Sequence, residues 1–181
     1  MSQSTLQTYL FLFFALVLFA SCSSQRVART ATPQKQATAK APREAASPKA
    51  EKAEKAEVVI STARAYLGTP YRYGGTDRKG IDCSGLLLCS FREADIKLPR
   101  TSAEQSSYGK AVSIYELRPG DLVFFSAKKW KGKVSHAGLV TEVRGKDEIL
   151  FIHSSTSKGV VESNLLSPYY RNIFVKARRP F

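Results

Sequence analysis

The chain has 181 residues, of which 43% are hydrophobic, and it carries a formal net charge of +13. Residues 23–56 hold eight Lys and Arg against three Asp and Glu, and residues 57–181 hold twenty against twelve, so both segments are basic. The basic residues form no stripe interleaved with stacking aromatic residues. This pattern argues against nucleic acid as a partner and favours an anionic polymer or a membrane surface.

A short apolar run lies near the N-terminus, at residues 9–20. A bilayer-spanning helix needs roughly 20 residues, so this run has the length of a signal-peptide core. The sequence Phe19-Ala20-Ser21-Cys22 is similar to a bacterial lipobox, although Phe19 stands where Leu is usual and no Lys or Arg precedes the run. We expect residues 1–21 to be a lipoprotein signal peptide and Cys22 to be lipidated. An ordinary cleaved signal peptide or a short anchor, with Cys22 incidental, is the alternative.

The segment that follows Cys22 has the composition of a tether. Residues 23–56 are rich in Ala, Lys, Glu, Pro, Ser and Thr and contain almost no large apolar side chain. Such a segment cannot bury enough surface to offset its ordering entropy. We therefore expect residues 22–56 to be a disordered basic tether, although the Ala, Lys and Glu content of residues 49–57 favours a transient helix.

Residues 57–181 have the pattern of one folded domain, with helices first and strands after. Apolar spacing, breaker residues and a capping box at residues 101–104 predict helices over residues 58–67, from about 83 to 94, and from 101 to about 109. A Gly- and Tyr-rich loop occupies residues 71–80. Strands are predicted over residues 122–125, 137–143, 149–153, 160–161 and 173–177, with a hairpin turn at 145–147. This order predicts an α+β domain with an antiparallel sheet.

Cys83 stands where the loop becomes the second helix, in the sequence Gly80-Ile81-Asp82-Cys83-Ser84-Gly85-Leu86. Unpaired backbone N–H groups and the positive end of the helix dipole favour a thiolate at such a position. Cysteines placed in this way have pKa values of roughly 3.5 to 7.5, against about 8.5 when free. We therefore expect Cys83 to be a reactive nucleophile, and a buried, inert thiol is the alternative.

The other two cysteines are accounted for separately. Cys22 belongs to the export signal. Cys89 lies six residues after Cys83 on the same predicted helix, a rise of about 9 Å, whereas a disulfide tolerates Cα separations of only about 7 Å. The two thiols should therefore not pair, and Cys89 is interpreted as a core residue.

The chain contains only two histidines, and both lie at the ends of predicted strands. His136 opens one strand and His153 ends the next, so the two can lie side by side across an antiparallel pair. One imidazole could then orient the other as the base of a thiol nucleophile. Two structural histidines are the alternative.

Four motifs occur in one order along the domain: Asp82-Cys83-Ser84-Gly85, Leu117-Arg118-Pro119-Gly120-Asp121-Leu122, Ser135-His136-Ala137-Gly138 and His153-Ser154-Ser155. Their order and spacing resemble those of the NlpC/P60 cell-wall peptidases, and the match spans about residues 57–178. The chain is most similar to the small lipoprotein endopeptidases of that family.

This resemblance implies a papain-like fold with a Cys–His–His triad, whose roles fall on Cys83, His136 and His153. The family's tyrosine near the oxyanion site falls on Tyr71, which could equally be a packing residue. Asp82 and Ser84 match positions that hold polar groups of the substrate. The resemblance also implies cleavage of bonds to D-glutamate or diaminopimelate in peptidoglycan stem peptides.

The sequence thus predicts a monomeric cysteine peptidase that acts on peptidoglycan, without a cofactor and without a metal. We expect it in the cell envelope, attached through its lipid to a membrane, most simply the outer membrane facing the periplasm. Two other functions stay open: an amidase or acyltransferase on the same fold, and a lipoprotein that binds peptidoglycan without cutting it.

Overall fold

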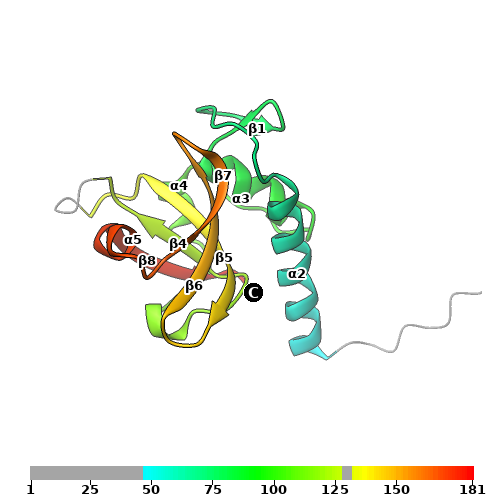
Figure 1. The fold of residues 1–181 in the computed structure, drawn as a ribbon. Helices are drawn as coiled ribbons and strands as arrows, with labels where there is room; N and C mark the ends of the chain where they lie inside the picture. The colour runs from blue at the N-terminus through cyan, green and yellow to red at the C-terminus, as the bar shows by residue number, and fades with distance from the viewer. Residues whose placement is uncertain (1–46, 128–131) are drawn as a thin grey trace, which may run out of the picture. The chain divides into compact units, whose positions relative to one another are not determined.

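The computed structural model describes residues 47–127 and 132–181 (Figure 1). The predicted signal peptide and Cys22 lie outside the described residues, as does most of the predicted tether. Within the described part of the chain, no helix is long and apolar enough to cross a membrane.

The first described helix, α2 (Pro48–Ala65), begins ten residues earlier than the apolar pattern indicates. Ser47 caps it by accepting a hydrogen bond from the Ala50 N–H, and Pro48 occupies its first turn, where a missing N–H costs nothing. Residues 48–56, which we expected in the tether, thus belong to this helix, and it includes the segment 49–57 whose composition favours a transient helix. Good helix formers extend a helix whose C-terminal half is held by burial of Val59, Ile60 and Ala63.

Two further helices precede the main sheet. Helix α3 (Cys83–Arg92) lies close to its predicted position. Helix α4 (Ser102–Gln105) has the predicted capping box, in which Thr101 and Glu104 bond each other's backbone N–H, but it ends four residues before Gly109. A short hairpin of β1 (Thr76–Asp77) and β2 (Gly80–Ile81) leads directly into α3.

The main sheet has six strands in the order β3-β8-β4-β5-β6-β7, and every neighbouring pair is antiparallel. The α+β class with an antiparallel sheet is thus confirmed. The predicted strands were each found within a few residues of their limits. The strands are β3 (Lys110–Val112), β4 (Leu122–Phe125), β5 (His136–Arg144), β6 (Glu148–Ser155), β7 (Gly159–Asn164) and β8 (Phe174–Arg179).

The sheet has a hydrophobic cluster on each face. Figure 1 shows α2 and α3 on one side of the sheet and α5 (Pro168–Ile173) on the other. Alternate residues of β4 face opposite ways: Leu122 and Phe124 pack with the helices, whereas Val123 and Phe125 pack with the cluster on the α5 side. Both histidine side chains lie on the α5 side of the sheet, because the His136 ring contacts Phe125 and the His153 ring contacts Phe151.

Candidate active site

Cys83 is the first residue of α3, as the sequence predicts, and its side chain is 7% exposed. Asp82 is the N-cap of the helix and accepts a hydrogen bond of 2.6 Å from the Gly85 N–H. Gly85 is needed for close approach, because a Cβ at this position would meet the Gly75 carbonyl oxygen. The Ser154 hydroxyl donates to the Ile81 carbonyl at 2.7 Å, which fixes the start of α3 against the end of β6.

Asp82 and Ser84 belong to a buried network beneath the nucleophile. The Arg100 guanidinium donates to both Asp82 oxygens, at 3.1 and 2.7 Å, and to the Ser84 hydroxyl at 2.8 Å. Ser84 in turn donates to Asp82 Oδ1 at 3.0 Å. The polar groups of Asp82 and Ser84 are thus hydrogen-bonded within the protein and support the helix start. Their predicted role in holding polar groups of the substrate stays a prediction.

The same network sets the ionisation of Asp82. Burial by itself would raise the pKa of this carboxyl group, but hydrogen bonds from Arg100, the Gly85 N–H and Ser84 outweigh it and hold the pKa below its usual range. The carboxylate also accepts a bond of 2.8 Å from the Gly74 N–H. A charged, fully bonded Asp82 thus anchors both α3 and the loop before it.

The two histidines meet as predicted, in a diagonal arrangement. Leu139 of β5 faces Ile152 of β6, so His136 and His153 lie on the same face but are displaced along the strands. His136 Nε2 and His153 Nδ1 are 2.9 Å apart, and the ring planes cross at 88°. The rings therefore form an edge-to-face pair joined by one hydrogen bond.

The second ring nitrogen of His153 also has partners, which sequence reasoning missed. His153 Nε2 lies 3.1 Å from the Ser163 hydroxyl and 3.1 Å from the Tyr170 hydroxyl. Ser163 comes from the part of β7 that was not predicted, and Tyr170 comes from α5, which was not predicted at all. No sequence signal marks either residue, because both act through tertiary proximity to His153.

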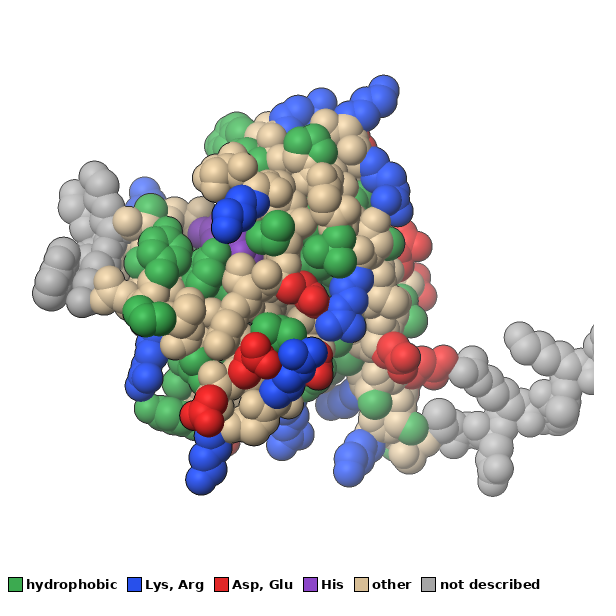
Figure 2. Space-filling view, in the orientation of Figure 1, with side chains coloured by type: hydrophobic (Ala, Val, Ile, Leu, Met, Phe, Trp, Pro, Cys, Tyr) green, Lys and Arg blue, Asp and Glu red, His purple; other side chains and the backbone are tan. Residues whose placement is uncertain are grey.

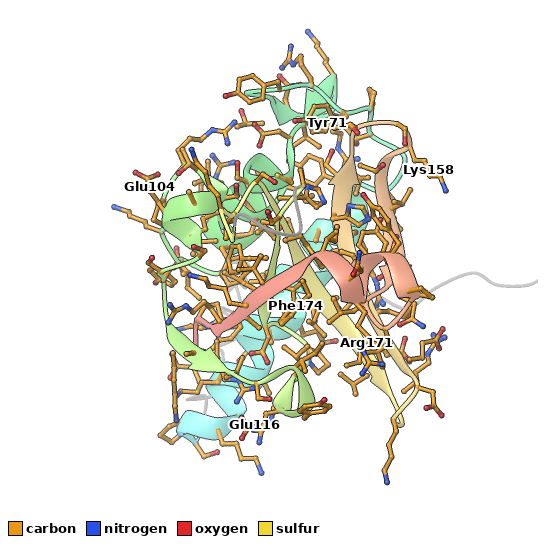
Figure 3. All side chains as sticks on the ribbon, turned by 90° about the vertical axis from the view of Figure 1, so that its left-hand side faces the viewer. Tyr71, Glu104, Glu116, Lys158, Arg171 and Phe174 are labelled. Atoms are coloured by element: carbon orange, nitrogen blue, oxygen red, sulfur yellow. The ribbon has the colours of Figure 1, made fainter. Side chains whose placement is uncertain are left out.

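A cavity of about 270 Å³ brings the predicted catalytic residues together. Its wall contains Cys83, His136 and His153, together with Tyr71. Figure 3 views the domain from the α5 side and shows Tyr71 and Lys158 at the same end of it. In Figure 2 histidine reaches the surface beside hydrophobic side chains. The remaining lining residues are Phe125, Ala127, Ser135, Ser155, Thr156, Tyr169, Tyr170 and Ile173.

Tyr71 is held beside the nucleophile by the backbone. It forms a β-bridge with Ile81, and the Ile81 N–H donates to the Pro70 carbonyl at 3.0 Å. Burial raises the pKa of the Tyr71 phenol, and the neighbouring Cys83 and Asp82 raise it further. The phenol is thus protonated at neutral pH and available as a hydrogen-bond donor in the cavity.

The environment of Cys83 differs from the prediction of a lowered pKa. Burial, the largest effect, raises the pKa of the thiol, and the negative charge of Asp82 raises it further. Hydrogen bonds from the backbone at Ala137, Ser84 and Cys83 itself lower it, but they do not offset burial. The helix start therefore does supply N–H groups to the sulfur, while the resting group is a neutral thiol.

Both imidazoles are neutral as well. Burial lowers the pKa of His136 to about 4. Burial and then the charge of a protonated His136 lower the pKa of His153 to about 3. Burial thus favours the neutral forms of both the thiol and the imidazole, so we expect the thiol proton to move to His136 during the reaction.

The remaining motifs have structural tasks. Asp121 is buried and accepts two hydrogen bonds from Arg179, at 2.8 and 2.7 Å, which joins β4 to β8. Ser135 accepts a bond of 2.9 Å from the Ala127 N–H and closes the loop before His136. Cys89 is an unpaired thiol like Cys83, and it donates to the Thr76 carbonyl at 3.2 Å.

Metal-binding side chains do not gather in the described part of the chain. Among residues 47–127 and 132–181, no group of three or more His, Cys, Asp or Glu residues could hold a metal ion.

A buried cysteine at a helix start shares one cavity with two hydrogen-bonded histidines. The helices packed on an antiparallel sheet that carry these residues form a papain-like α+β fold. The chain belongs to the NlpC/P60 family, whose sequence profile matches residues 68–179. The resemblance drawn from the four motifs is thus confirmed.

Two curated relatives come from Escherichia coli strain K12. The chain is 42% identical over 117 residues to the probable endopeptidase NlpC, and the alignment covers 64% of this chain and 72% of that protein. It is 43% identical over 115 residues to the murein DD-endopeptidase MepS/murein LD-carboxypeptidase, covering 63% of this chain and 57% of that protein.

A solved structure supports the same fold. The crystal structure of an NlpC/P60 family protein from Bacillus cereus matches with a TM-score of 0.62 at 35% identity. The match covers 68% of this chain and 39% of that chain. The likeness thus extends over the catalytic domain and not over the rest of that protein.

Proposed function

We propose that this chain is a cysteine endopeptidase that hydrolyses amide bonds in peptidoglycan stem peptides. The observation that carries the proposal is the joint placement of Cys83, His136 and His153 on one cavity, with the two imidazoles bonded to each other. The names of the two Escherichia coli relatives, an endopeptidase and a murein endopeptidase, support the substrate class. Bonds to D-glutamate or diaminopimelate are the proposed targets.

The first step is attack by the thiol on the scissile carbonyl. His136 Nε2 faces His153, so Nδ1 is the ring nitrogen left to take the proton of Cys83. The negative oxygen that forms is stabilised by the Cys83 backbone N–H at the helix start and by the Tyr71 hydroxyl. Tyr71 suits this role because its phenol stays protonated and shares the cavity with the sulfur.

The second half of the reaction returns the enzyme to its starting state. Protonated His136 donates its proton to the leaving amine, and the acyl group stays on the Cys83 sulfur. A water molecule, deprotonated by His136, then attacks the thioester and releases the carboxylic acid.

The experiment is a digest of purified peptidoglycan, with the products resolved by mass spectrometry. The proposal predicts released peptides whose masses show a cut within the stem, and no release by a Cys83→Ala variant with an unchanged thermal midpoint. A cut between sugar and stem would indicate an amidase, and transfer of a stem to an added amine would indicate an acyltransferase. Binding without any release would contradict the enzymatic proposal.

We further propose that Cys22 is lipidated and holds the domain at a membrane of the cell envelope, most simply the outer membrane facing the periplasm. The short apolar run followed by Ala20-Ser21-Cys22 supports this proposal. Stable anchoring takes more than one acyl chain, since a single chain binds only marginally. Wild-type protein should incorporate labelled palmitate and sediment with membranes, whereas a Cys22→Ala variant should do neither. Unlabelled wild-type protein would contradict the anchor.

A further inference from the structure

The hydrogen bonds of His153 continue beyond the predicted triad. One ring nitrogen, Nδ1, faces His136, and the other, Nε2, faces the hydroxyl groups of Ser163 and Tyr170, each at 3.1 Å. His153 itself is 2% exposed, so these protein groups take the place of water around its ring. The order of atoms is therefore His136 Nε2, then the two nitrogens of His153, then two hydroxyl oxygens.

Only one placement of hydrogens along this series of hydrogen bonds leaves His136 able to act as a base. Its Nδ1 must be unprotonated to accept the thiol proton, so in the neutral ring the hydrogen sits on Nε2. His136 Nε2–H then donates to His153 Nδ1, which must be bare. The hydrogen of His153 therefore sits on Nε2 and must be accepted by an oxygen.

The opposite placement is also hydrogen-bonded but cannot catalyse. If His153 carries its hydrogen on Nδ1, it donates to His136 Nε2, and the His136 hydrogen moves to Nδ1. That nitrogen then has no lone pair for the thiol proton. In that placement His153 Nε2 is bare and a hydroxyl group donates to it, whereas in the productive placement Nε2–H donates to a hydroxyl oxygen. The productive and unproductive placements therefore differ at His153 Nε2, in whether the neighbouring hydroxyl groups accept or donate.

We propose that Tyr170 and Ser163 are positioning residues that accept the His153 Nε2–H and thereby hold both histidines in the productive tautomer. This inference rests on the proposed cysteine mechanism, and it adds two residues that contact the third member of the proposed triad, His153. The two hydroxyls act together, because either oxygen alone can still accept the single hydrogen. Through these hydrogen bonds the two hydroxyl groups act on His153 and not on the Cys83 sulfur or the scissile bond, so we call them positioning residues.

The position of the Tyr170 ring supports this role. Its centroid lies 4.8 Å from that of Phe151 and 5.6 Å from that of Phe125, both in contacts with tilted or perpendicular planes. Phe151 in turn stacks on His153, with centroids 4.8 Å apart. The aromatic cluster on this face therefore fixes the phenol oxygen and the imidazole ring in relation to each other. Tyr170 comes from α5, the helix on which Arg171 is labelled in Figure 3.

The direct test is the tautomer of each ring, read from two-bond ¹⁵N–¹H correlation spectra of histidine-labelled full chain prepared without a histidine tag. The chain has two histidines, so two ring systems are expected. In wild-type protein at neutral pH both should be protonated on Nε2. In a Ser163→Ala/Tyr170→Phe double variant both should shift together toward the Nδ1–H form. Wild-type rings already protonated on Nδ1 would overturn the inference.

Kinetics on a stem tetrapeptide supply an independent measurement. The double variant should lose about 10- to 100-fold in kcat with little change in KM, whereas each single variant should lose at most about 5-fold. In a His153→Ala background the same two substitutions should cause no further loss, because the group they position is gone. Tyr115→Phe is the matched control, since Tyr115 is exposed and lies away from the cavity.

The outcomes separate this inference from the proposed function. If the wild-type chain cuts no stem peptide, the function fails, but the spectra still decide the tautomer. If the wild-type chain is active and the double variant keeps both its kcat and its Nε2–H rings, the positioning role is wrong. A further loss from the double substitution in the His153→Ala background would assign the two residues to packing, and would overturn the inference too.

Discussion

His136 Nε2 and His153 Nδ1 are joined at 2.9 Å across neighbouring strands, with their rings nearly perpendicular. The third member of the proposed triad is thus a neutral ring and not a carboxylate. It can orient its partner and accept one hydrogen, but it brings no negative charge to stabilise an imidazolium.

Removal of His153 should impair the chemistry without abolishing it. The thiol, the base and the oxyanion donors remain in His153→Ala, but His136 loses its orienting bond. We expect kcat to fall roughly 10- to 1,000-fold, within the range of general-base contributions. His153→Asn should recover part of this loss, and His136→Ala should be worse than either. Steady-state hydrolysis of a stem tetrapeptide measures this, and full activity of His153→Ala would place the third residue elsewhere.

Stability should fall in mild acid because of the two buried imidazoles. Their folded pKa values are about 4 and about 3, below the usual 6.5 of an unfolded chain. Between about pH 4 and 6.5 these two imidazoles bind more protons in the unfolded chain than in the folded one. The free energy of unfolding therefore decreases as the pH falls below about 6.5. Carboxyl groups titrate mainly below about 4.5.

Urea denaturation between about pH 4.5 and 7 measures this slope with little contribution from carboxyl groups. A His136→Asn/His153→Asn variant should show a much flatter profile over the same window. An equally steep profile in that variant would assign the acid sensitivity to other groups.

The network beneath Cys83 should contribute to stability. Asp82→Ala removes the helix cap and leaves the Arg100 guanidinium without its carboxylate. We expect a loss of about 1–3 kcal/mol, combining a lost cap with a partly exposed ion pair. Arg100→Met should cost less, since Asp82 keeps its backbone donors.

Arg92→Met is the matched control, because Arg92 lies exposed at the other end of α3. It should change stability by no more than about 0.5 kcal/mol. Thermal or urea unfolding of the three variants makes the comparison. A loss in Arg92→Met as large as in Asp82→Ala would contradict a specific role for the cap.

The sequence allowed the strands, the helix start at Cys83 and the meeting of the two histidines to be predicted, because local periodicity and chain order determine them. For residues 49–57 it indicated only a transient helix, and the start of α2 at Pro48 was not predicted, since a helix of polar residues has no apolar pattern to read. The pKa of Cys83 was predicted in the wrong direction, because burial depends on what packs over the sulfur and not on its position in a helix. Tyr170 and Ser163 were missed for a similar reason, as only the folded chain brings them to His153.

A raised thiol pKa also predicts how Cys83 reacts with a probe that needs no base. Its alkylation rate with iodoacetamide should climb steadily with pH from about 6 to 9, following the thiolate fraction. A preformed thiolate–imidazolium pair would instead give a rate already near its maximum at about pH 6. Peptide mass spectrometry of briefly labelled protein measures the rate at each cysteine, and a flat profile at Cys83 would show that the resting group is a thiolate.

Parallel loss of activity and of free Cys83 thiol during alkylation tests the central claim most directly. Samples are withdrawn while iodoacetamide reacts, and each is assayed for release of stem peptides and for the modified fraction of Cys83 and Cys89. The thiol mechanism predicts that residual activity equals the unmodified fraction of Cys83 at every time point, while Cys89, buried and bonded to Thr76, is modified later. Peptide release that persists after Cys83 is fully alkylated would contradict the account.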